Sequence, residues 1–202
     1  MIVMFADDSI SMAWLLPFLA SLDQFETDYI ASLFEFKSLK KDEFFIRRGD
    51  EVTKVAFVVK GNLTRYNDHE NDHMIIDQFL VSNQFFSDRK GYFSHQPSSY
   101  FIQANTPCHL WTISLTAINK LKKSSSKCIE IIDSIIEKTM NHAMDLKNML
   151  VIKDPLKKIL RFYELHPHSW PDIPKKHLPC YLNMSKALFY RCQTKKIKKV
   201  YL

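Results

Sequence analysis

The sequence predicts an α+β fold in which an antiparallel, jelly-roll-like β-roll is followed by one long helix and a small helical unit. Three observations indicate it. Residues 43–113 hold short runs rich in β-branched and aromatic side chains, residues 126–151 follow a heptad pattern, and a basic C-terminal segment shows two short helical patterns. The expected domains are 1–125, the roll with N-terminal helices, then 126–151, the long helix, and 152–202, the small unit.

Composition is typical of a soluble globular protein, with 46% hydrophobic and 25% charged residues. The apolar start carries Asp7 and Asp8 where an export signal would carry Lys or Arg, and Pro17 interrupts it. We therefore expect an amphipathic helix there, no signal peptide, no membrane span and a cytoplasmic protein. The cysteines are too scattered for a metal clip, which predicts reduced and mostly buried thiols. They are Cys108, Cys128, Cys180 and Cys192.

Six strands are expected in the roll, with turn-like segments between them. The strand sequences are FFIRR, VAFVVKG, NLTRY, MIIDQFL, YFIQA and HLWTI. Strands at this spacing favour an antiparallel sandwich or roll. The chain has only three glycines, and Gly49 and Gly61 fall between predicted strands. Both are expected to supply a positive φ at tight turns.

The segment from Ser126 to Val151 has apolar residues at heptad spacing, without Pro or Gly. A helix of this length, about 40 Å at 1.5 Å per residue, is unusual inside a small domain. We expect two copies to pair along it as a homodimer, the alternative being a helix packed on its own domain. The expected interface residues are Ile129, Ile132, Ile136, Ala143, Leu146 and Leu150, with Thr139 as a polar exception.

The C-terminal segment is strongly basic. From Lys153 onward twelve Lys or Arg face three acids, a net charge of +9, whereas the first 152 residues carry −3. After an amphipathic helix and a Pro-rich loop, two helices are expected around a tight turn, with Asn183 in a left-handed conformation and Ser185 as an N-cap. This arrangement is typical of a helix-turn-helix, whose second helix enters the DNA major groove.

The order of these elements resembles the Crp/Fnr family of bacterial transcription regulators. Three segments carry the resemblance: LKKDEFFIRRGDEVTKVAFVVKGNLTRY, IPKKHLPCYLNMSKALFYRCQTKK, and SDRKGYFSHQPSSYFIQAN, which is similar to a Bacteroidetes-type branch. The likeness runs from about Leu33 to Lys196. It implies a cytoplasmic homodimer with an effector-sensing roll and a winged-helix-like DNA-binding unit. The implied partners are double-stranded DNA, a second copy and RNA polymerase.

The effector pocket departs from the family pattern. By position, Asp88 stands where nucleotide-binding members offer an acid to the ribose, and Ser98, followed by Ser99, stands where they offer an Arg to the cyclic phosphate. A serine cannot replace a guanidinium that neutralises phosphate. The glycine-rich backbone is also changed, to Asn83 and Ser87. We therefore expect no cofactor and no binding of cyclic AMP, and the scattered cysteines do not supply an iron–sulfur site.

The predicted DNA-binding residues are Ser185, Lys186, Arg191, Lys195, Lys196, Lys175 and Lys176. Arg191 matches a family Arg that can reach a base edge. Ala187 replaces a Glu that reads a base in many members, and Pro179 should bend or shorten the first helix of the motif. The chain ends soon after, so the wing is expected to be reduced or absent.

No set of side chains predicts an enzyme. His69 and His73 are read as polar residues of a hairpin tip rather than metal ligands, and His166 and His168 as loop residues. The alternative to a DNA-binding regulator is a ligand-sensing or scaffold protein with a decayed helix-turn-helix. Salt-sensitive duplex binding would separate the two.

Overall fold

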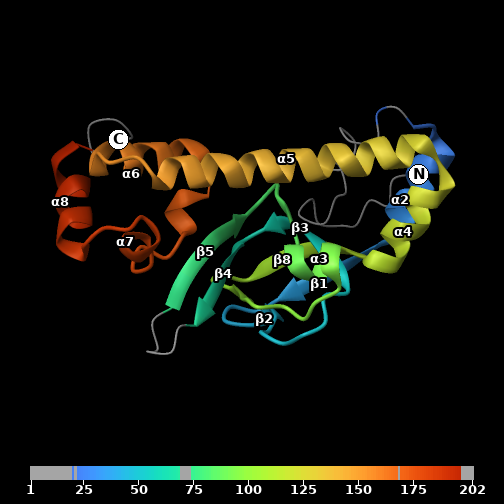
Figure 1. Ribbon diagram of the computed structural model, residues 1–202, viewed down its shortest axis with the longest axis horizontal. Helices are drawn as coiled ribbons and strands as arrows, with labels where there is room; N and C mark the ends of the chain where they lie inside the picture. Colours follow the sequence, from blue (N-terminus) through green and yellow to red (C-terminus); the bar gives the residue numbers. More distant parts are fainter. Residues whose placement is uncertain (1–19, 21, 69–73, 168, 197–202) are drawn as a thin grey trace.

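A computed structural model describes residues 20, 22–68, 74–167 and 169–196 (Figure 1). The N-terminal helix expected before residue 20 and the tip containing His69 and His73 lie outside these residues. The elements are α2 (Gln24–Ser32), β1 (Phe34–Leu39), β2 (Phe44–Ile46), β3 (Lys54–Lys60), β4 (Asn62–Asp68), β5 (Met74–Val81), β6 (Phe85–Phe86), α3 (Arg89–Ser94), β7 (Phe101–Ala104), β8 (Cys108–Ser114), α4 (Leu115–Ser124), α5 (Ser126–Leu150), α6 (Pro155–Leu165), the 3-10 helix η3 (Trp170–Asp172), α7 (Leu178–Tyr181) and α8 (Lys186–Lys196).

The predicted α+β fold is confirmed. Two four-stranded antiparallel sheets, in the orders β1-β8-β3-β6 and β2-β7-β4-β5, form the roll. Apolar side chains of both sheets are buried in one core between them, among them Val58, Leu63, Leu80, Ile102 and Leu110, none more than 1% exposed. Within the described residues no helix is long and apolar enough to span a membrane.

All six expected strands are present, and both glycine turns have the expected conformation. Gly49 and Gly61 have φ values of 89° and 90°. At Gly61 the backbone also approaches another strand, because an added Cβ would lie 2.5 Å from the carbonyl oxygen of Pro107. The sequence did not indicate β1, whose pairing with β8 extends from Phe34 opposite Ile113 to Leu39 opposite Cys108.

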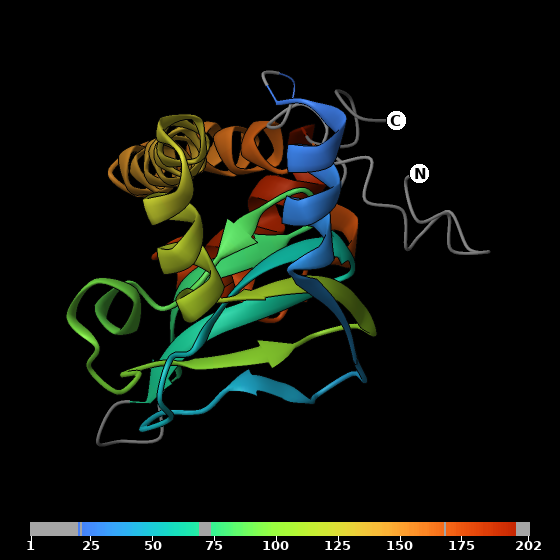
Figure 2. The same cartoon turned by 90° about the vertical axis from the view of Figure 1, so that its right-hand side faces the viewer.

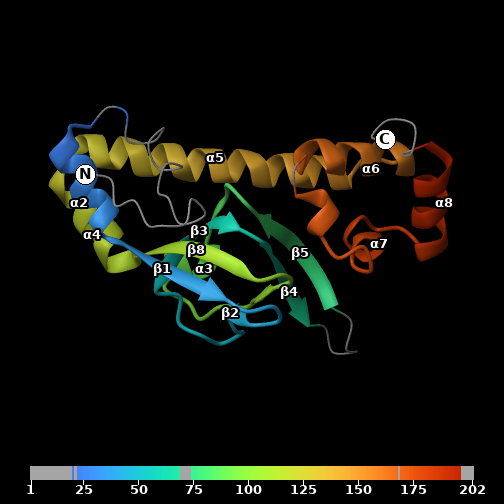
Figure 3. The same ribbon diagram turned by 180° about the vertical axis from the view of Figure 1, so that it is seen from behind.

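The long helix α5 has 25 residues and lies along one side of the roll (Figure 1). Figure 2 shows it nearly end-on above the sheets, and Figure 3 shows α2 and α4 at one of its ends and α6 to α8 at the other. The Ser125 side chain accepts a hydrogen bond from the Lys127 amide at its start. Its observed start agrees with the prediction, and its end differs by one residue.

The C-terminal helices share a core with the roll. Phe79 of β5 contacts Phe162 of α6 and Tyr181 of α7, with ring centroids 6.3 and 5.0 Å apart. The Asn62 side-chain amide of β4 also donates to the carbonyl oxygen of Asp172, at 3.1 Å. The helical unit is therefore docked on the second sheet, while the proposed division at residues 125 and 151 remains a prediction.

Candidate functional site

Asp88 and Ser98, the two residues expected at the effector pocket, bind each other. Asp88 is the N-cap of α3 and accepts a hydrogen bond from the Gly91 amide at 3.0 Å. The Ser98 hydroxyl donates to the other carboxylate oxygen of Asp88 at 2.9 Å. The two residues are 1% and 3% exposed. Their polar atoms therefore hold α3 in place. Neither these two residues nor the half-buried Ser99 line the cavity between the roll and α5 that is described next.

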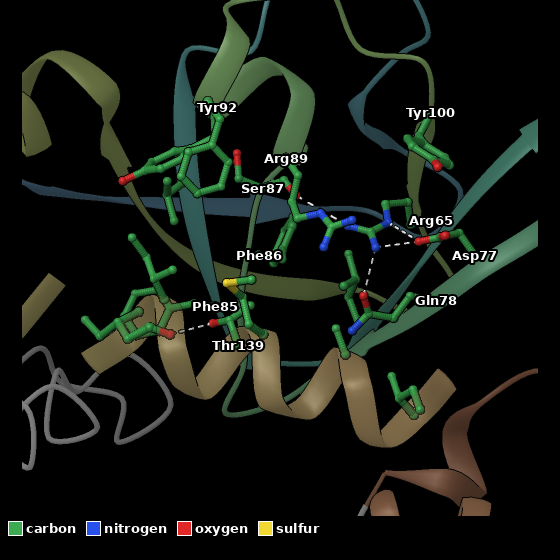
Figure 4. A pocket seen from close by; sticks show the side chains of 18 of the residues that line it. Arg65, Asp77, Gln78, Phe85, Phe86, Ser87, Arg89, Tyr92, Tyr100 and Thr139 are labelled. Atoms are coloured by element: carbon green, nitrogen blue, oxygen red, sulfur yellow. Dashed lines mark hydrogen bonds and ion pairs between the residues drawn. The ribbon is translucent and has the colours of Figure 1, made fainter. Parts of the chain in front are cut away.

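A cavity of about 590 Å³ lies between the roll and α5. Its volume is in the range that small-molecule sites occupy. One wall is the apolar face of α5, and the opposite wall comes from β4, β5, β6 and α3 (Figure 4). The α5 residues that line it include Ile131, Ile132, Ile135, Ile136, Thr139, Met140, Ala143 and Leu146.

Polar groups of the cavity gather around Arg65 of β4 (Figure 4). The Arg65 Nε donates to Asp77 at 2.6 Å and a terminal nitrogen donates to Gln78 at 3.0 Å, both on β5. Regular alternation would place these two neighbours on opposite faces, but the register between β4 and β5 shifts at this point. The guanidinium also lies 5.5 Å from the ring centroid of Tyr100. The sequence did not predict this cluster, because the cluster depends on the register shift between β4 and β5.

The two C-terminal helices and their turn form as predicted. Asn183 has φ 53°, in the left-handed region, and the Ser185 hydroxyl accepts from the Leu188 amide at 3.2 Å. Phe189 is fully buried and holds α8 against the preceding helices. Pro179 lies in the first turn of α7, where its missing N–H has no partner in the helix. α7 is only four residues long, but the proline does not shorten it in the way that the sequence predicted.

The predicted DNA-contacting side chains lie at the surface wherever they are described. Lys175, Lys176, Lys186 and Arg191 are exposed, and the side chains of Lys195 and Lys196 lie outside the described part of the chain. Ser185 is exposed and caps α8. Tyr190, 46% exposed, lies on the same helical face, four residues after Lys186. Its spacing of four residues from Lys186 would have predicted from the sequence that Tyr190 lies on this exposed face.

The heptad residues of α5 divide between two environments. Ile129 is 41% exposed, while Ile132, Ile136 and Ala143 are half-buried along the cavity side. Leu146 is only 4% exposed within its own chain, and the half-buried Leu150 packs against the core of the C-terminal helices. Two further side chains leave apolar surface on the helix, Met140 at 52% and Met144 at 58% exposed.

Two expectations about single side chains need correction. Cys108 and Cys128 are buried as predicted, but Cys180 is exposed because it lies on the outer side of the short α7. Burial raises the pKa of the Cys108 thiol to about 11. His166 follows α6 in a turn, as expected, yet it is only 1% exposed because it packs on Phe162. His168 lies outside the described residues.

Residues 36–125 match the family model of the cyclic nucleotide-binding domain. No curated protein matches the chain. Residues 36–125 are therefore similar in fold to cyclic nucleotide-binding domains, and solved structures extend the likeness to the helices that follow.

Three solved structures have a similar fold over most of the chain. FixK2 from Bradyrhizobium japonicum superposes with a TM-score of 0.66 at 15% identity, covering 80% of this chain and 83% of its own. A putative transcriptional regulator of the Crp/Fnr family from Eubacterium rectale gives 0.65 at 16%, covering 88% and 85%. The c-di-GMP-responsive regulator CLP from Xanthomonas campestris gives 0.60 at 14%, covering 86% and 91%. The chain thus has the fold of Crp/Fnr-type regulators.

Cyclic AMP is expected not to bind this fold at micromolar concentration. The Ser98 hydroxyl and the Asp88 carboxylate are already bonded to each other and buried, so neither meets a ribose or phosphate. The isoleucines of the α5 wall offer no partner to a purine, and unsatisfied polar groups would disfavour the complex. Calorimetry with cyclic AMP and cyclic GMP checks this, and a micromolar Kd for either nucleotide would contradict it.

Proposed function

We propose that this protein is a cytoplasmic, DNA-binding transcription regulator of the Crp/Fnr type, on the Bacteroidetes-type branch. It acts as a homodimer with a divergent effector domain, and RNA polymerase is a further partner. The observation that carries the proposal is α8. A capped helix presents Lys186 and Arg191 to solvent, while Phe189 anchors its other face. Such a helix suits the major groove, where Arg recognises guanine through two hydrogen bonds.

Charge supports the same assignment. The segment from Lys153 carries a net +9, and Lys175 and Lys176 are exposed just before α7. Lysines at that position would contact phosphates on either side of the groove and set the orientation of α8. Most of the affinity should then come from phosphate contacts and should fall steeply as salt rises.

Arg191→Ala is expected to remove sequence recognition more than affinity. The loss in binding free energy should be roughly 1–3 kcal/mol on a selected duplex and much less on a scrambled duplex. The ligand for the test is DNA recovered by genomic selection with the purified protein. Binding isotherms on selected and scrambled duplexes at two salt concentrations give both values.

Arg161→Ala is the matched control for Arg191→Ala. Arg161 is an exposed arginine of the same basic segment, but it lies on α6 and is paired with Glu164 at 3.0 Å. The Arg161→Ala variant should weaken binding to the selected and the scrambled duplex by the same small amount. If the wild type binds selected and scrambled duplexes equally well, the DNA-reading proposal is wrong. The alternative, a sensing or scaffold protein with a decayed motif and the short α7, then takes its place.

The dimer is proposed to form along α5. Ile129, Met140 and Met144 expose apolar surface beside Ile132 and Ile136, and covering that surface is favourable. Two helices paired here would present two copies of α8 to DNA. The operator should then be a rough palindrome with half-sites about one helical turn apart.

Ile136→Asp is expected to weaken dimerisation by at least about tenfold, because it places a carboxylate in an apolar seam. Asn141→Asp adds the same charge at an exposed position of α5 outside the heptad seam and should leave the dimer intact. Sedimentation of the three proteins checks this, with circular dichroism to establish that each is folded. A wild-type chain that is monomeric at tens of micromolar, on the order of ordinary assay concentrations, would contradict the dimer.

A further inference from the structure

The cavity between the roll and α5 has an excess of positive charge at one end. Arg65 and Arg89 both line it, and Figure 4 shows their side chains reaching toward the same region. Asp77 is the only acidic residue among the described lining residues, and it is already paired with Arg65. Arg89, the first residue of α3, has no ion pair or hydrogen bond to a described side chain that would neutralise it.

Most of the remaining lining is apolar, although Asn67 of β4 and Lys147 of α5 also contribute to it. Isoleucines of α5 form one long wall, and β-branched and aromatic residues of the roll face them. Thr139, the hydroxyl side chain of that wall, already donates to the carbonyl oxygen of Ile135 at 2.8 Å. A ligand with polar groups along its length would leave them without partners there. A ligand with one charged end and an aliphatic body would satisfy both regions.

We propose that this cavity binds an amphipathic monoanion, a carboxylate that carries an aliphatic chain. The carboxylate lies against the guanidinium groups of Arg65 and Arg89, where charge-assisted hydrogen bonds form. The chain extends along Ile131 and Ile135 of α5. This site is separate from Asp88 and Ser98, which bind each other outside the cavity.

The two walls explain how such a ligand would be used. One wall belongs to the roll and the other to α5, and α5 continues to its contacts with α6. A bound aliphatic chain adds contacts between the two and favours the arrangement in which they are closest. This use in regulation rests on the proposed function, whereas binding itself does not.

The test is calorimetry of the full chain with dodecanoate below its micelle concentration. We expect saturable binding of about one molecule per chain, because the cavity has the volume of a single small-molecule site. Dodecyltrimethylammonium, which has the same tail and the opposite charge, should show no saturable binding. Arg89→Gln should weaken dodecanoate binding about tenfold, because one charge-assisted contact is lost.

Two variants make the result specific to the cavity. Lys90→Gln removes the same charge from the neighbouring exposed residue, which does not line the cavity, and should bind dodecanoate like the wild type. Ile135→Trp should abolish binding by filling the space along α5. The proposal is overturned if both tailed ligands bind alike, if Arg89→Gln and Lys90→Gln behave alike, or if dodecanoate does not bind. No DNA enters this assay, so its failure and the failure of the DNA-reading proposal are distinguishable.

Discussion

Gly61→Ala is expected to destabilise the fold by about 3–5 kcal/mol. Two costs add at this position. The φ of 90° is unfavourable for any residue with a Cβ, and the added Cβ would lie 2.5 Å from the Pro107 carbonyl oxygen and 2.7 Å from the Cys108 sulfur. Because Pro107 contributes a backbone atom, the turn before β8 must move for the methyl group to fit. Urea denaturation followed by circular dichroism measures the loss.

Gly49→Ala separates the two costs. Gly49 has nearly the same φ, 89°, but no atom lies within 4 Å of an added Cβ. It should therefore show only the backbone cost, about 1–2 kcal/mol. Equal losses for the two variants would mean that the close approach at Gly61 relaxes without cost, contrary to this account.

These two glycines show which structural features a local sequence pattern can predict. A glycine between two strand-like runs indicates a positive φ, and both values are as expected. The same holds for Asn183 and the Ser185 cap, because turn and cap preferences depend on neighbouring residues alone. The approach of Pro107 to Gly61 joins residues far apart in the chain, so no local pattern reports it.

The candidate site was harder to predict for the same reason. Arg65, Asp77 and Gln78 meet only because the register shifts between β4 and β5, and a one-residue shift moves side chains to the other face. The family resemblance directed attention instead to Asp88 and Ser98, whose bond to each other depends on the fold of α3 and its following loop. The docking of α6 and α7 on Phe79 could not be predicted either, because it brings together residues about 80 to 100 positions apart in the chain.

His166 is expected to make the fold sensitive to acid. It is buried where α6 ends, with its ring centroid 4.7 Å from that of Phe162 and 5.8 Å from that of His142 on α5. Neither ring nitrogen of His166 has a hydrogen-bond partner among the described residues. Nearby, His142 interacts with Gln84 of the roll at 2.8 Å. A proton on His166 would therefore lie between α5 and α6 without an acceptor.

Burial lowers the pKa of His166 from 6.5 to about 4, with a smaller contribution from His142. Burial also lowers the pKa of His142, and Asp145 opposes that shift. Below pH 6.5 the unfolded chain takes up a proton that the folded chain does not accept until about pH 4. Stability is therefore full above that window and is lost as the pH falls through it, by on the order of 3 kcal/mol for His166 in total.

Between about pH 7.5 and about pH 5, urea denaturation of the wild type should show a fall of roughly 2 kcal/mol in the free energy of unfolding that is due to His166. Any change with pH that all variants share comes in addition. His166→Phe keeps a ring beside Phe162 and removes the titrating group, so its stability should fall less between the two pH values. His95→Asn is the control, because His95 is exposed and its φ of 51° suits asparagine. It should keep the wild-type dependence. If His166→Phe loses as much stability as the control on acidification, the buried histidine is not the acid-sensitive group.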